Sequence, residues 1–443
     1  MSATEKVDIL LLGAGGREHA LLRKLAESPR AGKLWAAPGN GGILAEATLA
    51  EVTGADGTTA PLDQDSPEAV ASFAKEHGIG LVVIGPEAPL VAGVGDAVRA
   101  AGIACFGPSG EAAQMEGSKL FAKQVMERAG VPTARYRSFT EQAPAEAYVR
   151  ELAGPCVVKA DGLAAGKGVI VAQTTEEALE GLRECFSGQF GVAGNTVVVE
   201  ELLKGPECSL LALTDGTTVV PLASSQDHKR ALEGDLGPNT GGMGVYSPVP
   251  FVTPEEHEAM VEIERKVVAQ LKADGITYSG CLYGGFMLTK DGPKVLEFNA
   301  RFGDPETQVV LPRMKADLVD VFLRCDNGTL ADAQVSWDDD WAVSVVLTSA
   351  GYPGHYEKGK VITGIEDAER VPGVTVYHAG TAVRDGELVT NGGRVLNVTA
   401  VADSFQGARD LAYQACELIH FEGKTLRHDI GARALRGRSA WEV

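Results

Sequence analysis

Short apolar runs alternate with amphipathic stretches between Val7 and about Gly110. Apolar runs bounded by glycine or proline predict buried strands, and apolar positions spaced three and four residues apart predict helices. Because strands and helices alternate, we expect a parallel sheet wrapped by helices, with ligands at the carboxyl ends of its strands. The predicted strands are Val7–Leu12, Lys33–Ala37, Leu81–Ile84 and Ala104–Gly107, and the predicted helices are Glu18–Ser28, Pro67–His77 and Ala92–Ala101.

The remaining sequence has a different rhythm, with strands predicted around glycine turns and fewer helices. After about residue 331 the pattern indicates a β-rich α+β segment that ends in a helix. The predicted elements are a helix that Ser118 caps and Gly130 stops, a strand–loop–strand–helix–strand series over 156–201, a helix over 255–274, a hairpin over 284–298 and a final helix over 408–420.

Composition restricts the class of protein. The chain has 443 residues, which at about 150 residues per domain favours three domains. Its 44% hydrophobic and 23% charged residues are typical of a globular protein, and its 54 glycines suit loops that approach ligands closely. No apolar run approaches the roughly 18 residues of a membrane span, and the polar N-terminus lacks the apolar stretch of a signal peptide, so we expect a cytoplasmic protein.

Charge and cysteine content exclude several kinds of partner. The 40 Lys and Arg residues against 60 Asp and Glu residues give a net charge of −20, which disfavours binding to nucleic acid or to an anionic membrane. A phosphorylated small molecule would need locally placed cations and backbone N–H groups. The seven cysteines include no C-x-x-C pair and the eight histidines no H-E-x-x-H motif, so we expect reduced thiols and neither disulfides nor zinc.

The first glycine loop, Gly13–His19, follows a predicted strand and opens a predicted helix, where free N–H groups favour an anion. Glu18 replaces the third glycine of a dinucleotide fingerprint, and no acidic residue ends the second strand, so NAD is disfavoured. Turns at residues 13–16, 39–42 and 85–90 are expected to hold a smaller phosphate ester together, with ordinary βα turns as the alternative. The expected contacts are Gly15, Gly16, Arg17, Gly39, Asn40, Pro86 and Glu87.

The second glycine loop lies between two apolar runs within Val157–Val171. It fails the P-loop pattern because Asp161 and Gly168 stand where glycine and Ser or Thr are required, and because a strand follows. We expect a hairpin whose tip closes over a polyphosphate, with Lys159 on the strand and Lys167 on the tip; a plain surface hairpin is the alternative. The tip adds Gly162, Gly166 and Gly168 to the expected nucleotide contacts.

Glu297 and Asn299 stand two residues apart on a predicted strand, so their side-chain oxygens point the same way. Oxygen ligands of this kind suit Mg²⁺ or Mn²⁺, and Arg301 can stabilise a transferring phosphoryl group beside them. The spacing alone is a weak signal, because polar residues also alternate on a solvated strand face. Asp304 and Glu306 strengthen it, since such a concentration of polar groups is costly without a ligand.

Two further segments carry candidate substrate contacts. Asp227, Lys229 and Arg230 follow a predicted strand, and a cation there could hold a carboxylate or a phosphate; a solvated turn is the alternative. The glycine-rich loop that begins at Asn239 suits a nest of backbone N–H groups, with an ordinary loop as the alternative. The contacts expected from this loop are Asn239, Thr240, Gly241 and Gly242.

Several polar residues leave two roles open. Asp304 is expected either to bind a substrate ammonium group or to orient Arg301, and Arg394 either reaches a substrate phosphate from the last domain or lies on a surface turn. We expect His19 and His228 to be hydrogen-bonded structural or substrate-contacting groups, not general bases.

The motifs resemble a known family. Lys119, the hairpin Lys159–Gly168, the segment Val199–Glu207 and the Glu297-x-Asn299-x-Arg301 strand come in the order and spacing of the ATP-grasp fold. From Val7 to about Ala434 the chain more narrowly resembles the phosphoribosylamine–glycine ligase family, also called glycinamide ribonucleotide synthetases. The strings that carry this resemblance are Gly13–His19, Gly85–Leu90, Gln226–Arg230, Gly237–Gly244 and Asn299–Glu306.

The resemblance implies a fold and a division into domains. The expected α/β fold is an ATP-grasp fold with an N-terminal Rossmann-like parallel α/β domain and a C-terminal β-rich α+β domain. The implied bounds are 1–115 for the first domain, 116–330 for the ATP-grasp domain with a mobile lid over about 134–200, and 331–443 for the last domain. A monomer or small homo-oligomer is expected.

The resemblance also implies a reaction and residue roles. Glycine's carboxylate would attack the γ-phosphate of ATP, and the amine of 5-phosphoribosylamine would displace phosphate, giving glycinamide ribonucleotide for purine synthesis. In this chain Lys119 and Lys159 would hold nucleotide phosphates, and Arg301, Lys229 and Asp304 would serve catalysis. Adenine would meet Glu200, Glu201 and Leu203, ribose would meet Glu207, and Mg²⁺ or Mn²⁺ would bind Glu297 and Asn299.

One departure from the wider superfamily leaves the metal set open. Many ATP-grasp relatives carry a further metal-binding carboxylate on the preceding hairpin strand, whereas Tyr283–Leu288 contains no acid. Water, substrate phosphates or Asp304 could complete the coordination of a second magnesium. The rival hypotheses are an ATP-grasp carboxylase or transformylase that phosphorylates bicarbonate or formate, and a nucleotide-binding sensor without catalysis.

Overall fold

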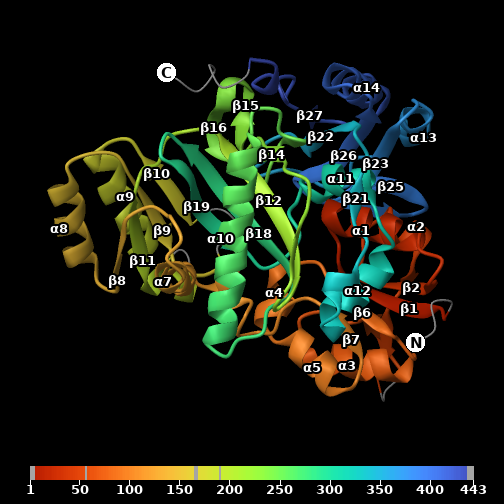
Figure 1. Cartoon of the computed structure of the whole chain (residues 1–443). Coiled ribbons are helices and arrows are strands. Elements are labelled where there is room, and N and C mark those ends of the chain that lie inside the picture. Colours follow the sequence, from red (N-terminus) through yellow and green to blue (C-terminus); the bar gives the residue numbers. More distant parts are fainter. Residues whose placement is uncertain (1–4, 55–56, 164–167, 189–190, 437–443) are drawn as a thin grey trace.

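The computed structural model describes residues 5–54, 57–163, 168–188 and 191–436. The first part of the chain forms a parallel sheet of order β3-β2-β1-β6-β7, drawn in red and orange in Figure 1. Its strands are β1 (Val7–Gly13), β2 (Ala31–Pro38), β3 (Thr48–Leu49), β6 (Leu81–Ile84) and β7 (Ala104–Phe106). The helices are α1 (Gly16–Ala26), α2 (Ile43–Glu46), α3 (Pro67–Glu76), α4 (Glu87–Val91) and α5 (Val94–Ala100), and β4 (Glu51–Thr53) pairs with β5 (Thr59–Pro61) in a small hairpin.

Helices α6 (Gln114–Gly117) and α7 (Lys119–Ala129) lead from this sheet to a separate lobe, at the left of Figure 1. Ser118 caps α7 as predicted, since its Oγ accepts a hydrogen bond from the N–H of Phe121 at 3.1 Å, and Gly130 ends the helix with a φ of 63°. We call this lobe the lid lobe. Its antiparallel sheet has the order β10-β9-β11-β8. Its elements are β8 (Tyr136–Phe139), α8 (Gln142–Leu152), β9 (Cys156–Ala160), β10 (Val169–Ala172), α9 (Thr175–Phe186) and β11 (Val197–Glu201).

A second antiparallel sheet, of order β13-β12-β18-β19, stands beside the lid lobe, and the long helix α10 (Pro254–Ala273) lies along it (Figure 1). The register between β18 and β19 shifts after the pair Gly285 and Glu297, which leaves Leu296 as an extra residue on β19. A bulge of this kind re-aims side chains and is common beside active sites. The strands are β12 (Glu207–Asp215), β13 (Val219–Pro221), β18 (Ser279–Thr289) and β19 (Gly292–Asn299).

The last sheet contains strands from two distant parts of the chain. Its order is β14-β17-β22-β26-β23, with β27 paired to β22. The first two strands precede α10, so the segment predicted for the ATP-grasp domain contributes to the last sheet. The strands are β14 (Gln226–Asp227), β17 (Gly244–Ser247), β22 (Trp341–Ser349), β23 (Val374–His378), β26 (Arg394–Ala402) and β27 (Lys424–Thr425), and α14 (Phe405–Leu418) covers them.

Short elements connect these sheets. The helices are α11 (Thr307–Val310), α12 (Leu318–Asn327) and α13 (Ile365–Glu369). The two-stranded ribbons pair β15 (Arg230–Leu232) with β16 (Leu236–Asn239), β20 (Met314–Lys315) with β21 (Ser336–Trp337), and β24 (Thr381–Arg384) with β25 (Glu387–Thr390). The predicted mixed α/β fold, with a parallel first sheet and a β-rich last part, is confirmed. Helices α8 and α12 and strand β22 were not predicted.

The hydrophobic core is divided unequally. Strand β1 sends Leu10 and Leu12 into one cluster and Ile9 and Leu11 into another, as alternation along a strand requires. Both clusters also contain residues of the β12–β18 sheet and of the last sheet, so these parts pack as one body. The lid lobe has its own cluster, whose buried members all lie between Ala145 and Val199.

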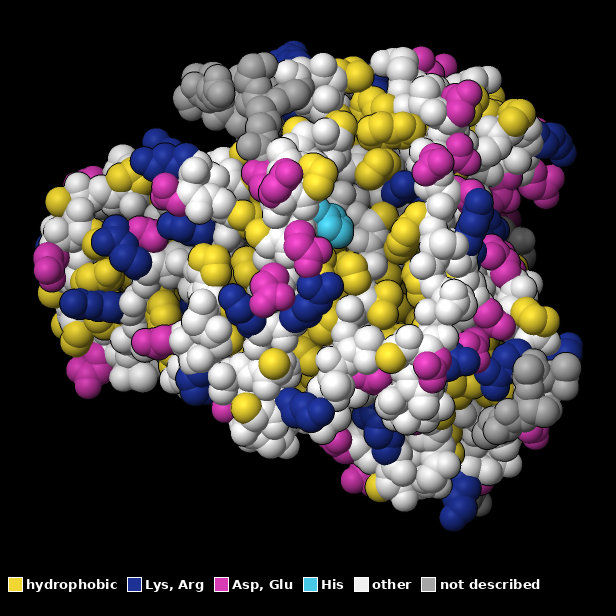
Figure 2. All heavy atoms as spheres, viewed as in Figure 1, with side chains coloured by type: hydrophobic (Ala, Val, Ile, Leu, Met, Phe, Trp, Pro, Cys, Tyr) yellow, Lys and Arg dark blue, Asp and Glu magenta, His cyan; other side chains and the backbone are white. Residues whose placement is uncertain are grey.

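The surface and the cysteines agree with the composition. Acidic and basic side chains are interspersed over the face shown in Figure 2. Each of the seven cysteines lies within the described ranges and is buried with a free thiol, as predicted. Within the part of the chain that the structure describes, no helix is both long and apolar enough to cross a membrane.

Candidate active site

A cavity of about 780 Å³ opens where the lid lobe, the β12–β18–β19 sheet, the first domain and the last sheet meet. Small-molecule sites usually have volumes of about 300–1,000 Å³. Most of the residues singled out from the sequence line this one cavity. They are Arg17, Glu87, Lys119, Lys159, Gly162, Gly168, Glu200, Glu201, Leu203, Glu207, Asp227, Lys229, Asn239, Thr240, Gly241, Glu297, Asn299, Arg301, Asp304 and Arg394.

A smaller set of predicted contacts lies elsewhere. Gly166 and Lys167 are outside the described residues. The others are not part of the cavity lining, although Gly16, Pro86 and Gly242 are each next in sequence to a residue that is. They are Gly15, Gly16, Gly39, Asn40, Pro86 and Gly242.

Two lysines approach the cavity from different elements. Lys119, at the start of α7, donates a hydrogen bond from Nζ to the carbonyl of Gly162 at 2.9 Å. Lys159, on β9, donates a hydrogen bond from Nζ to the carbonyl of Leu296 at 3.0 Å. Leu296 is the extra residue of the β19 bulge. The ammonium group of Lys159 is also 3.0 Å from Oε2 of Glu200 on β11. Two cations that reach one cavity in this way suit a polyphosphate.

Glu200 is almost fully buried, with 2% of its side chain exposed. Its Oε1 atom lies 3.1 Å from the ammonium of Lys123 but accepts no hydrogen bond of normal geometry from the described residues. Glu201 also lines the cavity, and its carboxylate accepts a hydrogen bond from Arg135 Nε at 2.8 Å. Beyond them, Leu203 lies in an irregular segment after β11. Apolar residues from both neighbouring sheets complete this end of the cavity: Val157, Val171, Met287 and Leu296.

Glu297 and Asn299 are alternate residues of β19, as predicted. Burial opposes ionisation of Glu297, but the charges of Lys229, Lys159 and Lys119 outweigh it and lower its pKa. The carboxylate is therefore ionised at neutral pH. Across the described ranges, no group of three His, Cys, Asp or Glu side chains could hold a metal ion. One carboxylate and one amide oxygen fit Mg²⁺ that takes its remaining ligands from water and substrate phosphates, and do not fit an all-protein cage.

Arg301 is held by two carboxylates. Its Nη2 lies 2.9 Å from Glu116 and its Nε 3.5 Å from Glu87, while Nη1 donates to the carbonyl of Phe302 at 3.1 Å. Although burial acts against the charge, Glu116 and Glu87 raise the pKa of Arg301. The guanidinium group is thus a fixed, permanently charged feature of the cavity wall.

Asp304 does not orient Arg301, so that one of its two expected roles is wrong. Its carboxylate accepts hydrogen bonds from the backbone N–H of Arg17 at 3.3 Å and from Gln308 Nε2 at 2.9 Å, and it lies 3.4 Å from Arg394. The geometry explains the difference, because Arg301 faces the α6 side of the cavity and Asp304 faces α1.

Arg394 begins β26 and enters the cavity from the last sheet. Its Nη1 donates to the carbonyls of Gly241, at 2.6 Å, and of Asp304, at 2.8 Å. The alternative of a surface turn is therefore wrong. Arg394 connects the loop at Gly241 to the loop at Asp304, which follows β19.

Lys229 and Glu207 contact each other across the cavity wall, with 3.0 Å between Nζ and Oε2. Glu207, together with Glu297, raises the pKa of Lys229 well above its ordinary value. Asp227 has a carboxyl group whose pKa is raised well above the usual range, chiefly by burial and by the nearby Glu306. The raised pKa favours the charged form of Lys229 and the neutral form of Asp227, although the two residues stand in one short segment.

The first glycine loop is filled by Glu18. Its carboxylate accepts a hydrogen bond from the N–H of Gly15 at 2.6 Å and from Arg17 Nε at 2.5 Å. A Cβ atom added at Gly85 would lie 2.1 Å from Oε1 of Glu18, so this glycine makes room for the glutamate. The space at the strand end that a dinucleotide pyrophosphate would enter is thus occupied by a side chain.

Asn40 and His19 connect the first domain to the last. The amide nitrogen of Asn40 donates to the carbonyls of Ala14 and His378, both at 2.8 Å, and its oxygen accepts the N–H groups of Gly42 and Ile43. This side chain has no capacity left for a substrate. His19 Nδ1 accepts the N–H of His378 at 2.8 Å, which gives it the structural role considered from the sequence.

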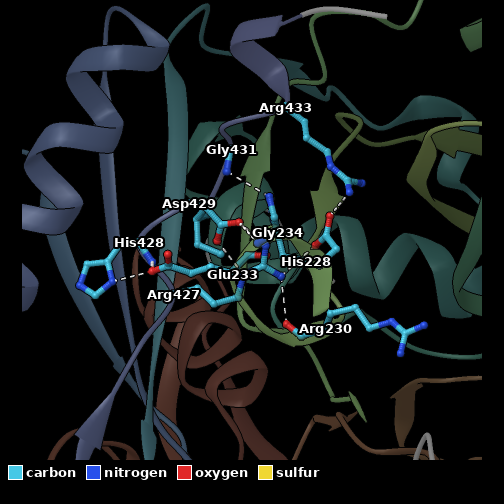
Figure 3. Close-up of polar contacts among 12 residues, drawn as sticks. His228, Arg230, Glu233, Gly234, Arg427, His428, Asp429, Gly431 and Arg433 are labelled. Atoms are coloured by element: carbon cyan, nitrogen blue, oxygen red, sulfur yellow. Dashed lines mark hydrogen bonds and ion pairs between the residues drawn. The ribbon is translucent and has the colours of Figure 1, made fainter. Parts of the chain in front are cut away.

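The β15–β16 ribbon and its turn contribute Arg230, Asp235 and Asn239 to the cavity lining. Arg427 holds this ribbon from the C-terminal segment (Figure 3). Arg427 is 2% exposed, and its Nη1 donates to the carbonyl of Arg230 and to Asp235, both at 2.9 Å. Its other nitrogens bind Asp429 at 2.8 Å, and Asp429 also accepts the N–H of Gly234. Nearby, His228 Nε2 accepts the N–H of Gly431 at 3.0 Å (Figure 3). The C-terminal segment thus holds the ribbon in place.

Sequence reasoning missed several residues that line the cavity or support it. Glu116 and Lys123 stand on short or amphipathic helices, where charged residues usually face water. The one available signal was the four-residue spacing of Lys123 from Lys119, which places both on one helix face. The remaining missed residues are Tyr352, Arg427 and Arg433, whose partners are distant in sequence.

Comparison with known proteins gives the family. Models of the phosphoribosylglycinamide synthetase N domain, ATP-grasp (A) domain and C domain match residues 7–116, 117–307 and 342–433. The phosphoribosylamine–glycine ligases of Rhizobium meliloti (strain 1021) and Yersinia pestis are both 49% identical to this chain, over 98% of its length and 100% of theirs.

Solved structures agree with these matches. A crystal structure of phosphoribosylamine–glycine ligase from Thermotoga maritima superposes with a TM-score of 0.81 at 35% identity, covering 96% of this chain and all of that one. Biotin carboxylase from Campylobacter jejuni, at 15% identity and a TM-score of 0.71 over 96% of this chain and 94% of its own, shares the fold. The resemblance predicted from the sequence is confirmed, and this chain belongs to the phosphoribosylglycinamide synthetase family of ATP-grasp enzymes.

Proposed function

We propose that this chain ligates glycine to 5-phosphoribosylamine at the expense of ATP, the reaction named by its relatives. A glycine carboxylate oxygen attacks the γ-phosphorus, the bond from that phosphorus to its bridging oxygen breaks, and ADP leaves. The amine nitrogen of phosphoribosylamine then attacks the carbonyl carbon of glycyl phosphate, phosphate leaves, and the amine loses a proton. The observation that carries the proposal is the convergence of Lys119, Lys159, Glu297 and Arg301 on one cavity in a chain of this family.

Nucleotide binding follows from the charges and the unfilled hydrogen-bonding capacity of the cavity. Lys119 and Lys159 would neutralise the phosphates. The buried Oε1 of Glu200 is suited to accept a hydrogen bond from the adenine amino group, because it receives none of normal geometry from the protein. Glu207 would accept hydrogen bonds from the ribose hydroxyls. Its carboxylate must then either give up its contact with Lys229 or bind Lys229 and the ribose together.

Magnesium is proposed on Glu297 and Asn299. A magnesium ion held by these two side chains would supply positive charge beside the transferring phosphoryl group. The cluster of Lys119, Lys159 and Lys229 keeps Glu297 ionised and so ready to coordinate. Manganese has the same ligand preference and is proposed as a substitute.

Arg301 is proposed to stabilise the acyl phosphate and the transition states on either side of it. Glu116 and Glu87 hold the guanidinium group before any substrate arrives, so little reorganisation is needed during the reaction. Arg17, Arg394 and the loop Asn239–Gly241 would surround the remaining substrates, with Lys229 toward the glycine carboxylate.

The proposal is tested by ADP release from the purified full chain with Mg²⁺. We expect ADP only when ATP, glycine and phosphoribosylamine are all present. Release with bicarbonate or formate in place of glycine would support the rival ATP-grasp reactions, and ATP binding with no turnover would support a sensor. Glu297→Gln, which keeps the size of the side chain, should abolish ADP release with unchanged thermal unfolding. Full turnover of that variant at saturating Mg²⁺ would contradict the metal assignment.

A further inference from the structure

Lys123 is a buried cation to which the proposed reaction gives no role. It stands on α7 with 2% of its side chain exposed, although it lines the same cavity as Lys119 and Lys159. Lysine is almost never buried to this extent unless it is paired. Burial lowers the pKa of Lys123 to about 8 against the opposing charge of Glu200, so the side chain is mostly charged at neutral pH.

The contacts of Lys123 bind three parts of the protein together. Its ammonium lies 3.1 Å from Oε1 of Glu200, on the lid lobe. It also donates a hydrogen bond to Thr133 Oγ1 at 2.7 Å, and that hydroxyl donates to the carbonyl of Val295 on β19 at 2.7 Å. The ring of Tyr136, 5.5 Å away, closes the remaining side.

Lys159 approaches the same carboxylate from the other side. Its ammonium is 3.0 Å from Oε2 of Glu200, and its second contact is the carbonyl of Leu296, the residue after Val295. Two ammonium groups therefore share one buried carboxylate, so the charges of these three groups sum to +1. Such a cluster attracts an anion, whereas a single lysine–carboxylate pair is already neutral.

We propose that Lys123 is a positioning residue for the nucleotide, which keeps Glu200 paired so that Lys159 is free to bind a phosphate group. The proposal rests on the proposed function, in which Lys159 is a phosphate ligand. If Lys159 were the sole partner of Glu200, its movement to a phosphate would leave a buried carboxylate unpaired, which is strongly unfavourable. With Lys123 in place, Glu200 keeps a counter-ion throughout and its position beside the adenine site does not change.

The test is the affinity for ADP in the presence of MgCl₂, measured by isothermal titration calorimetry on the full chain. We expect Lys123→Met to weaken ADP binding about tenfold or more, because loss of the pairing charge ties Lys159 to Glu200. In a Glu200→Gln background, where there is no carboxylate to compete for Lys159, adding Lys123→Met should change the affinity by less than about threefold. Lys266→Met, on the exposed face of α10, is the matched control and should bind ADP normally.

A structural role for Lys123 gives a different result. Lys123→Gln can still donate a hydrogen bond to Thr133 but carries no charge, so we expect it to lose affinity as Lys123→Met does. Normal ADP binding by Lys123→Gln, or an equal loss in the wild-type and Glu200→Gln backgrounds, would overturn the proposal. If Lys123→Met does not fold, Lys123→Gln and the double variant still decide the question.

Failure of this inference is distinct from failure of the proposed function. If the wild-type chain binds no ADP, or if Lys159→Met binds it as tightly as wild type, the nucleotide assignment itself is wrong. If wild type binds ADP and Lys159→Met does not, while Lys123→Met behaves as wild type, only the role of Lys123 is refuted.

Discussion

The ammonium of Lys229 lies 3.0 Å from the carboxylate of Glu207, so two residues proposed for different substrates are each other's partner. Glu207 opens β12, and Lys229 follows β14 at the edge of the last sheet. If the proposed roles hold, a ribose hydroxyl that displaces Lys229 from Glu207 would free the ammonium group for the glycine carboxylate. We therefore expect nucleotide binding and glycine binding to be coupled through this ion pair.

We expect an unreactive ATP analogue to tighten glycine binding two- to fivefold, about what a partly exposed ion pair contributes. In Glu207→Gln, where Lys229 is already released, glycine affinity should be the same with and without the analogue. Calorimetric titration of glycine measures both. Equal glycine affinity in the wild-type chain with and without the analogue would show that the pair does not couple the sites.

Arg301→Lys is expected to lower the rate of ADP release by about 10²–10³-fold while leaving ADP affinity nearly unchanged. A lysine keeps the charge but cannot contact Glu116, Glu87 and a developing acyl phosphate at once. Single-turnover ADP release, with ADP titration as the control, separates chemistry from binding. A variant with weakened ADP binding and a normal rate would place Arg301 in the nucleotide site instead.

Arg427→Lys is expected to cost about 2 kcal/mol of unfolding free energy, because a lysine keeps the charge but cannot contact Asp235, Asp429 and the carbonyl of Arg230 at once. The β15–β16 ribbon ends at Asn239. Just beyond it, the N–H and hydroxyl groups of Thr240 donate hydrogen bonds to the carbonyl of Lys229, the residue before the ribbon. We therefore also expect the KM for glycine to rise severalfold while ADP affinity stays normal. Urea unfolding and steady-state kinetics measure these effects, with the exposed Arg265→Lys as the control. A stability loss without any change in KM would limit Arg427 to a structural role.

Acid should destabilise the fold through two buried histidines of the last sheet and its flanking loops, His228 and His378. Burial lowers the pKa of His228 to about 4 and that of His378 to about 3, so the folded chain keeps both rings neutral. The unfolded chain protonates them below about pH 6.5, so it binds more protons than the folded chain, and stability falls as pH drops.

We expect a loss of about 2 kcal/mol for each of these histidines between pH 6.5 and 4.5, with no contribution from them above that window. Urea unfolding across this range gives the slope. His378→Gln should reduce the fall in unfolding free energy between pH 6.5 and 4.5 by about 2 kcal/mol, the contribution of one histidine. An unchanged pH dependence would show that His378 does not take up a proton on unfolding.

Much of the fold was predictable because its signals are local. The strand and helix rhythm of the first domain and the cap at Ser118 depend on residues close in sequence. Lys159, Glu297 and Arg301 were found for the same reason, since each stands on or directly after a predicted strand. Lys119 was singled out only by the resemblance to the ATP-grasp fold.

The unpredicted features depend on contacts between distant residues. Strands β14 and β17 join a sheet whose other members lie about a hundred residues later, which no local pattern reveals. Arg394 was ambiguous because its partners, Gly241 and Asp304, come from other segments. Glu18 was recognised only as a missing glycine, whereas its carboxylate fills the loop.

Among the residues that the structure describes, the lid lobe has an apolar cluster of its own, which makes this part of the protein a separable module. Buried side chains of residues 145–199 pack among themselves, whereas the first and last domains share both remaining clusters with the central sheet. Recombination between relatives should therefore accept a foreign segment over 136–201 with its core intact, provided that Lys123 and Thr133 still meet their partners. An exchange of the first or last domain alone would disrupt the two apolar clusters that these domains share with the central sheet.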